Sequence, residues 1–173
     1  NTSMKSFSFC KKCKDEYENP LNRRYHAQPI SCENCGPNVT LYNINNGIVS
    51  NNIEAIKKTA LLIKEGYIIG VKGLGGFHLI CDATNDNSVN TLRINKNRAK
   101  KPYALLFKDI NSIKDYTNIN LKEEEVLTSK EKPIVLLNKK NNSDISKFVS
   151  PNVNKLGCFI AYTGLHHLLF RYL

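Results

Sequence analysis

Long apolar runs are missing from this 173-residue sequence. No stretch approaches the roughly 20 apolar residues that a membrane-spanning helix needs, and no charged-then-apolar segment resembles a signal peptide. We therefore expect a cytoplasmic protein with no membrane partner. The single methionine is Met4, as a processed or excised chain would show. The 41% hydrophobic and 23% charged residues are the balance of an ordinary globular protein.

Acidic residues are also scarce. The sequence has fifteen Asp and Glu residues and twenty-five Lys and Arg residues, which gives a formal net charge of +10. Residues 51–173 hold nineteen of the basic and eleven of the acidic side chains, so most of the surplus belongs to this larger part. A positive surplus favours anionic partners such as nucleotides, phosphorylated substrates or nucleic acid. A lysine-rich solvated surface would carry the same charge.

Cysteine is used sparingly but in a pattern. Four of the six cysteines form C-x2-C-x18-C-x2-C, namely Cys10, Cys13, Cys32 and Cys35. Each pair can point two thiolates at one ion, and four thiolates close a tetrahedral shell, so the spacing predicts one structural zinc ion. A redox dithiol is the alternative. Cys81 and Cys158 lie singly in apolar stretches and are expected to be small buried core residues.

Two neighbours of this pattern bear on the zinc hypothesis. Gly36 follows the last cysteine and is expected to adopt the left-handed conformation of a knuckle turn. His26 lies between the pairs but is not needed as a ligand. A segment this short cannot bury a core of its own, and zinc binding worth roughly 10–16 kcal/mol can supply the missing stability.

The chain divides by pattern into a finger at residues 1–46 and a larger domain at 52–173, joined through the turn Asn45-Asn46-Gly47. In the larger domain a helix is expected from Asn52 to a stop at Gly66, with Ile53, Ile56, Ala60 and Ile63 facing the core. After this helix, segments with strand-like apolar patterns alternate with segments of helical pattern, which predicts an α/β (α+β) fold. Strands are expected at 39–44, 67–72, 77–81, 103–107, 134–137 and 157–161, and further helices at 86–98, 109–116, 121–130 and 165–173.

A glycine-rich loop lies between two of these strands. It comprises Lys72, Gly73, Gly75 and Gly76, and it matches neither a Walker loop nor a dinucleotide fingerprint. Backbone amides of such a loop can approach a phosphate closely. A plain glycine-rich hairpin or crossover explains the glycines equally well.

A run of cations follows at residues 93–101. Arg93, Lys96, Arg98, Lys100 and Lys101 occur with no acidic residue among them. Because like charges repel, such density favours a nearby anion, and arginine can grip two phosphate oxygens at once. A solvated helix end is the alternative. The pair His166-His167 has no metal-ligand spacing, so one of the two is expected to pack inward.

Together these segments resemble a known family. The stretch from Cys10 to Pro37, with Asn22-Arg-Arg-Tyr-His-Ala-Gln-Pro29 before the second cysteine pair, closely resembles the second zinc finger of the HypF carbamoyltransferases, which mature nickel–iron hydrogenases. The stretch Val71–Ala83 resembles the start of that family's YrdC-like domain. The residues Lys96-x-Arg98 and Lys101-Pro102-Tyr103-Ala104 are similar to its nucleotide element, and Leu165–Leu169 to its L-H-x-L-L segment.

The resemblance implies a YrdC-like twisted mixed sheet flanked by helices, preceded by the small four-cysteine zinc finger. It also implies ATP binding with magnesium and formation of carbamoyl adenylate from carbamoyl phosphate-derived carbamate, for transfer to the C-terminal cysteine of a HypE-like acceptor. Carried over residue by residue, Lys96, Arg98 and Lys101 would contact phosphates, and Lys72, Gly73, Gly75 and Gly76 would line the nucleotide site. No catalytic residue is identified.

Two departures from the family pattern shape the expectations. The usual L-P-Y-T-P is replaced by Ile160-Ala-Tyr-Thr-Gly164, and the chain ends at Leu173, ahead of the family's Ser/Thr-Gly-Asn segment. We therefore expect a C-terminally truncated domain. The alternative function is a double-stranded RNA or other nucleic-acid binding module, whose affinity would fall steeply with salt.

Overall fold

The computed structural model describes residues 8–45 and 47–173. The chain forms two compact units, Asn1–Ala55 and Ile56–Leu173. Among the described residues, no helix combines the length and the apolar character needed to cross a bilayer.

Before residue 52, the described residues form one helix and one hairpin. Helix α1 (Lys11–Glu18) begins directly after Cys10, and strands β1 (Thr40–Asn43) and β2 (Gly47–Asn51) pair antiparallel, Thr40 opposite Asn51. β2 occupies the segment in which we expected only a connection. The predicted turn lies partly outside the described residues because Asn46 is not among them.

Helix α2 (Asn52–Lys64) follows at once and shows the predicted apolar spacing in part. Ile56, Ala60 and Ile63 are buried, whereas Ile53 is exposed. Gly66 adopts a positive φ of 90° just beyond the last turn, which is the left-handed conformation that ends helices. The stop expected at this glycine is confirmed.

Strands β3 (Ile69–Lys72) and β4 (Phe77–Ile80) form an antiparallel hairpin, with Ile69 opposite Ile80. Helix α3 (Asp86–Asn95) then begins at Asn85, whose side chain accepts a hydrogen bond from the Ser88 amide at 3.1 Å. Val89 on this helix is buried. The helix ends before residue 98, and Asn97 takes a positive φ of 47°.

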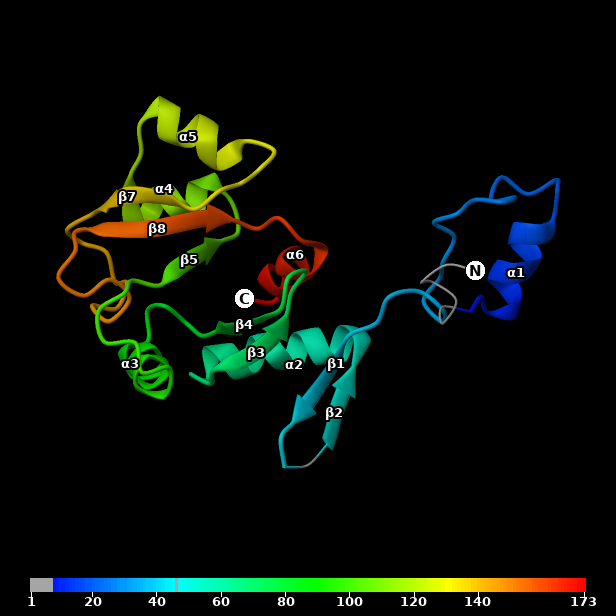
Figure 1. Ribbon diagram of the computed structural model, residues 1–173, viewed down its shortest axis with the longest axis horizontal. Helices are drawn as coiled ribbons and strands as arrows, with labels where there is room; N and C mark the ends of the chain where they lie inside the picture. The colour runs from blue at the N-terminus through cyan, green and yellow to red at the C-terminus, as the bar shows by residue number, and fades with distance from the viewer. Residues whose placement is uncertain (1–7, 46) are drawn as a thin grey trace. The chain divides into compact units, whose positions relative to one another are not determined.

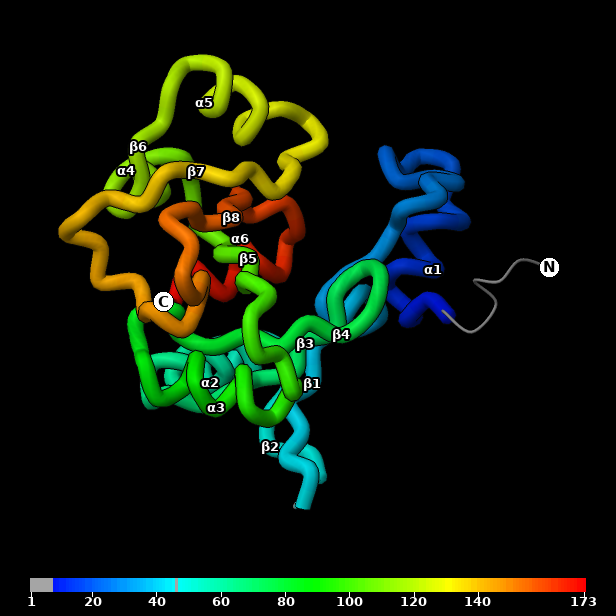
Figure 2. The backbone as a smooth tube through the Cα atoms, turned by 60° about the vertical axis from the view of Figure 1, so that its left-hand side comes forward, coloured from blue at the N-terminus to red at the C-terminus, as the bar shows by residue number. Residues whose placement is uncertain are grey.

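A four-stranded sheet with the order β5-β8-β7-β6 forms the centre of the second unit (Figure 1). Its strands are β5 (Ala104–Phe107), β6 (Thr117–Asn118), β7 (Val135–Lys139) and β8 (Lys155–Ile160). β5 and β8 are parallel, and the other two pairings are antiparallel. Figures 1 and 2 show β5 and β8 side by side. The mixed sheet predicted from the resemblance is confirmed.

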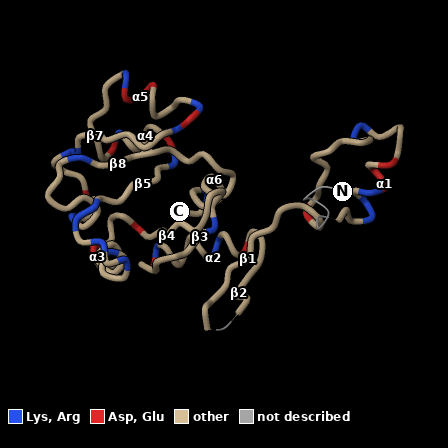
Figure 3. The backbone as a smooth tube through the Cα atoms, viewed as in Figure 1, with Lys and Arg blue, Asp and Glu red and all other residues tan. Residues whose placement is uncertain are grey.

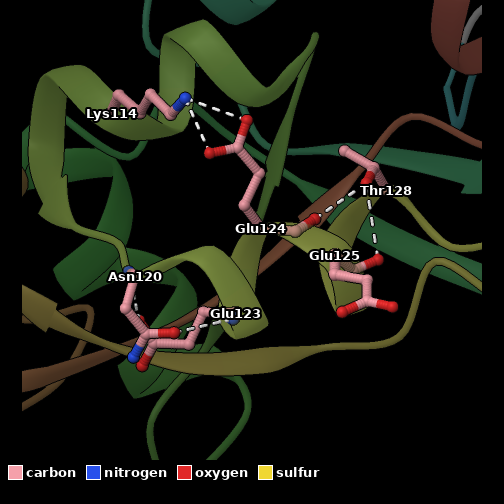
Figure 4. Close-up of polar contacts among 6 residues, drawn as sticks. All are labelled: Lys114, Asn120, Glu123, Glu124, Glu125 and Thr128. Carbon is pink, nitrogen blue, oxygen red and sulfur yellow. Dashed lines mark hydrogen bonds and ion pairs between the residues drawn. The ribbon is translucent and has the colours of Figure 1, made fainter.

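Helices α4 (Ile110–Tyr116) and α5 (Leu121–Thr128) pack on this sheet and on each other. Lys114 on α4 forms an ion pair with Glu124 on α5 at 2.8 Å (Figure 4). Asn120 and Glu123 cap α5 reciprocally, since each side chain accepts a hydrogen bond from the other's backbone amide. The polar sequence between the two helices thus fixes where the second begins.

The sheet and helices enclose one apolar core that includes Leu127, Leu137, Leu156 and Cys158. Cys158 is fully buried as expected, whereas Cys81 is only half-buried at the edge of this core. Helix α6 (Gly164–Phe170) follows β8, with His166 buried and His167 exposed. The expectation that one of these two histidines packs inward is confirmed.

Leu137 offers a direct test of this core. Leu137→Ala should lower the free energy of unfolding by roughly 2–5 kcal/mol, because it removes a fully buried side chain and leaves a cavity. Its neighbour Leu136 is 61% exposed on the other face of β7, so Leu136→Ala is the matched control and should change stability little. Urea denaturation followed by circular dichroism measures both, and equal effects would contradict the assigned faces.

Candidate functional site

The four paired cysteines come together in the first unit. Their sulfur atoms all lie within 4.8 Å of one another. Cys10 and Cys32 are 3.5 Å apart, and Cys32 and Cys35 are 3.8 Å apart. Sulfurs bound to one zinc ion at about 2.3 Å in a tetrahedron are about 3.8 Å apart, so the cluster has the size of a four-thiolate metal site.

Backbone amides prepare this cluster for an ion. Hydrogen bonds from the Asn34 and Cys35 amides lower the pKa of Cys32 to about 6, and the amides of Cys10 and Cys32 lower that of Cys35. Burial and the neighbouring thiols raise the pKa of Cys13. Cys32 is therefore the thiol most readily converted to the thiolate that a metal binds.

Gly36 serves the cluster differently from what we expected. Its φ lies outside the left-handed range, so the predicted left-handed turn is wrong. Its amide donates to the Cys32 carbonyl at 2.7 Å, and a Cβ at this position would stand 2.7 Å from that same oxygen. Glycine is needed here because the backbone passes too close for any side chain.

Little else holds the finger together. Of its described apolar side chains, Cys13 and Ile30 are buried. The His26 ring stacks on the ring of Tyr17 at 5.0 Å and on that of Tyr25 at 4.1 Å. A core this small cannot offset the entropy of ordering the chain, so the stability of the finger depends on a bound metal.

The glycine loop in the second unit is a hairpin turn. The Gly73 amide donates to the Gly76 carbonyl at 2.7 Å, and Lys72 pairs with Phe77 across the turn. Gly76 has a positive φ of 150°, which disfavours any side chain. The plain hairpin interpretation is therefore confirmed, while nucleotide contacts from Lys72, Gly73, Gly75 and Gly76 stay a prediction.

The cationic segment after α3 is held by one buried arginine. Figure 3 shows basic residues gathered around this end of α3. Arg93 is 7% exposed, and its guanidinium donates to the Phe148 carbonyl at 2.6 Å and to the carbonyls of Arg98 and Lys101. Carbonyl oxygens thus accept the hydrogen bonds of Arg93, which we had counted with the cations that favour an anion.

Arg98 is oriented by similar contacts. Its Nε donates to the Lys101 carbonyl at 3.0 Å and its Nη2 to the Pro102 carbonyl at 2.7 Å. The Tyr103 ring contacts both guanidinium groups, at 4.8 Å from Arg93 and 4.9 Å from Arg98. These contacts restrict the guanidinium of Arg98 and leave its remaining donors for a ligand.

A cavity of about 1200 Å³ lies within the second unit and is lined by residues of α2, β4, β5 and α6. Lys96 and Arg98 belong to its wall; the other predicted residues, Lys72, Lys101 and the three loop glycines, are not among its lining residues. Two lining residues carry buried polar atoms without a hydrogen-bond partner in the described part of the chain: Tyr103 through Oη and His166 through Nδ1. The sequence did not identify either residue as a candidate site residue, because the local sequence pattern does not show which polar atoms are buried without a partner.

A four-cysteine cluster followed by an α/β domain with a partly cationic cavity defines a finger-plus-YrdC class of protein. A family model described as "Telomere recombination" (Sua5, YciO and YrdC) matches residues 61–173, and one described as "HypF finger" matches residues 9–42. The chain belongs to the Sua5/YciO/YrdC family and carries the finger characteristic of HypF, as the sequence resemblance predicted.

Relatives of the chain are HypF carbamoyltransferases. The chain is 39% identical over 168 residues to carbamoyltransferase HypF of Rhodobacter capsulatus, covering 97% of the chain and 22% of the relative. It is 41% identical to the HypF of Synechocystis, covering 97% of the chain and 28% of that relative. The chain thus spans about a quarter of the length of these relatives.

Solved structures of HypF are also similar to the chain. A crystal structure of full-length HypF in its phosphate- and nucleotide-bound form is 38% identical with a TM-score of 0.78, covering 99% of the chain and 22% of that structure. HypF of T. kodakarensis is 42% identical with a TM-score of 0.83, at the same coverage. E. coli YciO, at 12% identity and a TM-score of 0.60, covers 71% of the chain and 61% of that structure, and it shares the fold.

Cys32→Ser should abolish metal binding by the finger, because it removes the thiol that ionises most readily. Cys81→Ser is the control, since Cys81 lies outside the cluster. Elemental analysis of the purified chain should give about one zinc ion per chain for the parent and the control, as one shell of four thiolates requires. Zinc retained in full by Cys32→Ser would contradict the site.

Arg93→Lys should destabilise the second unit by roughly 2–3 kcal/mol, because one ammonium group cannot reach the several carbonyls that the guanidinium fork satisfies. Arg171→Lys, at an exposed position, is the control for the same chemical change. Thermal unfolding monitored by circular dichroism compares the two. A loss no larger than that of the control would show that Arg93 does not hold the loop.

Proposed function

We propose that this chain is part of a HypF-type carbamoyltransferase, and that its YrdC-like domain binds ATP with magnesium and forms carbamoyl adenylate. In this reaction a carbamate oxygen, derived from carbamoyl phosphate, attacks the α-phosphorus of ATP. A new P–O bond forms, the bond to the β-phosphate bridge breaks, and pyrophosphate leaves. The thiolate of the C-terminal cysteine of a HypE-like acceptor then attacks the carbamoyl carbon, a C–S bond forms, the bond from that carbon to the phosphate oxygen breaks, and AMP leaves.

The observation that carries the proposal is the cavity wall that contains Lys96 and Arg98. These are the cations of the K-x-R element, and the related HypF crystal structure is of a phosphate- and nucleotide-bound form. Adenylyl transfer, like phosphoryl transfer, needs positioning and charge stabilisation more than covalent help from the protein, and cations with fixed donors provide both. Magnesium enters with the phosphates and needs few protein ligands.

The contacts of Arg98 favour this role. Two carbonyl oxygens hold its Nε and Nη2, so its guanidinium keeps one orientation in the cavity wall before any ligand arrives. An arginine fixed in advance loses less conformational entropy when it binds phosphate. Lys101 contributes its carbonyl oxygen to this arrangement, which gives it a part in the site besides the phosphate contact predicted for its ammonium group.

The finger is proposed to hold zinc as a structural ion. Four thiolates leave no open position for water or substrate, so the metal would act through folding. The nucleic-acid alternative stays a prediction from charge, since the relatives and the described residues add no observation that favours it.

ATP binding tests the proposal. Isothermal titration of the zinc-loaded chain with Mg·ATP should show saturable binding, and Lys96→Ala should weaken it roughly ten- to hundredfold, because a phosphate contact of one ammonium group is worth roughly 1.5–3 kcal/mol. Lys100→Ala is the matched control: Lys100 is exposed like Lys96 and belongs to the same segment, but it does not line the cavity.

Titrations at low and moderate salt separate the two functions. ATP affinity should depend on Lys96 at both salt concentrations. Binding of a generic RNA duplex that exceeds ATP binding at low salt, collapses with salt and weakens equally in Lys96→Ala and Lys100→Ala would favour the nucleic-acid alternative. A folded parent chain without saturable ATP binding would refute the nucleotide proposal for this chain.

A further inference from the structure

One residue of the cavity has a buried polar group that neither the fold nor the proposed phosphate site uses. His166 is 4% exposed, lies in the cavity wall, and has no hydrogen-bond partner for Nδ1 within the described residues. A buried nitrogen without a partner destabilises the fold, so an apolar side chain would stabilise this position better. The packing role expected for a buried histidine does not account for this cost.

The cavity changes chemically along its length. β5 and β8 run parallel, with Ala104 opposite Gly157 at one end and Phe107 opposite Ile160 at the other, about 10 Å along the strands. The cationic segment leads into the first end, and α6 with His166 follows the second (Figure 1). Lys96 and Arg98 therefore lie toward one end of the cavity and His166 toward the other.

The end near His166 is aromatic. Tyr162 packs edge-on against the His166 ring at 4.9 Å, and Phe159 contacts Tyr162 at 6.3 Å. All three side chains line the cavity. Aromatic walls beside a neutral polar group suit a planar heterocycle, whereas phosphates suit the cationic end.

Burial also determines the charge state of the imidazole. Desolvation lowers the pKa of His166, and the neighbouring His78 and His167 lower it further. The ring is therefore neutral near pH 7, with one nitrogen that donates and one that accepts a hydrogen bond. A neutral imidazole is a poor partner for phosphate and a good partner for the polar edge of a base.

We infer that His166 recognises the adenine base, by accepting a hydrogen bond from the exocyclic 6-amino group. The inference rests on the proposed ATP function and assigns the base to the end of the cavity opposite the phosphates. No hydrogen bond within the described residues holds Nδ1, so turning the ring toward a ligand in the cavity would break no hydrogen bond at that nitrogen. His166 then determines base specificity and takes no part in the chemical step.

The test removes each partner of this hydrogen bond separately. The probes are ATP and purine riboside 5′-triphosphate, which differ only in the 6-amino group, each titrated with magnesium. The parent chain should bind ATP about fivefold more tightly, which is what one neutral hydrogen bond provides. His166→Leu should bind both probes with equal affinity, near that of the parent for purine riboside triphosphate.

Two further variants complete the design. His167→Leu makes the same change at an exposed neighbouring position outside the cavity lining, and it should keep the preference for ATP. His166→Leu should unfold at the temperature of the parent or above, because it removes an unpartnered buried nitrogen. His166→Gln retains a hydrogen-bond acceptor and should keep part of the preference for ATP over purine riboside triphosphate. This variant provides a second test if the leucine variant does not fold.

The outcomes separate the two proposals. If the parent binds ATP in a Lys96-dependent manner but His166→Leu keeps the full preference for ATP, the assignment of His166 is overturned and the nucleotide proposal stands. If the parent binds ATP and purine riboside triphosphate equally, the assignment is likewise overturned. If the parent binds neither probe, both proposals fail for this chain.

Discussion

The parallel pairing of β5 with β8 is the constraint on which the second unit depends. Parallel neighbours cannot be joined by a tight turn, so the chain must cross over between Phe107 and Lys155. That crossover contains α4, β6, α5 and β7, which supply the remaining strands and the helices packed on the sheet. It also fixes the cationic segment at one end of the strand pair and α6 at the other, so the polarity of the cavity follows from topology.

Within this frame a buried arginine organises the cationic segment. Arg93 donates to carbonyls at 98 and 101 on one side and at 148 and 149 on the other, and so joins the loop before β5 to the loop before β8. A guanidinium has several donors in a rigid plane, and few other groups could satisfy so many converging carbonyls. The cations of this segment therefore have two different roles. Arg93 holds the two loops together, while Lys96 and Arg98 line the cavity.

The first unit follows a different rule. Its described buried apolar residues before α2 are too few for a core, and four thiols within 4.8 Å take the place of one. Backbone amides that lower the pKa of Cys32 and Cys35 favour the thiolate form of these two residues. The free energy of metal binding then supplies the free energy that stabilises the folded finger.

The sequence by itself determined those features that depend on neighbours a few residues apart. The thiol cluster follows from two C-x-x-C pairs, α2 from apolar spacing and Gly66, and the hairpin of β3 and β4 from two apolar runs around glycines. The prediction missed α1, which has no apolar stripe, and the short strands β2 and β6, whose pairing is all that defines them. Only tertiary structure decided that Arg93 is buried, that Gly36 is required by a close carbonyl, and that His166 lines a cavity far along the chain from Lys96. Each of these depends on atoms whose positions the fold alone sets, and local sequence pattern carries no information about such contacts.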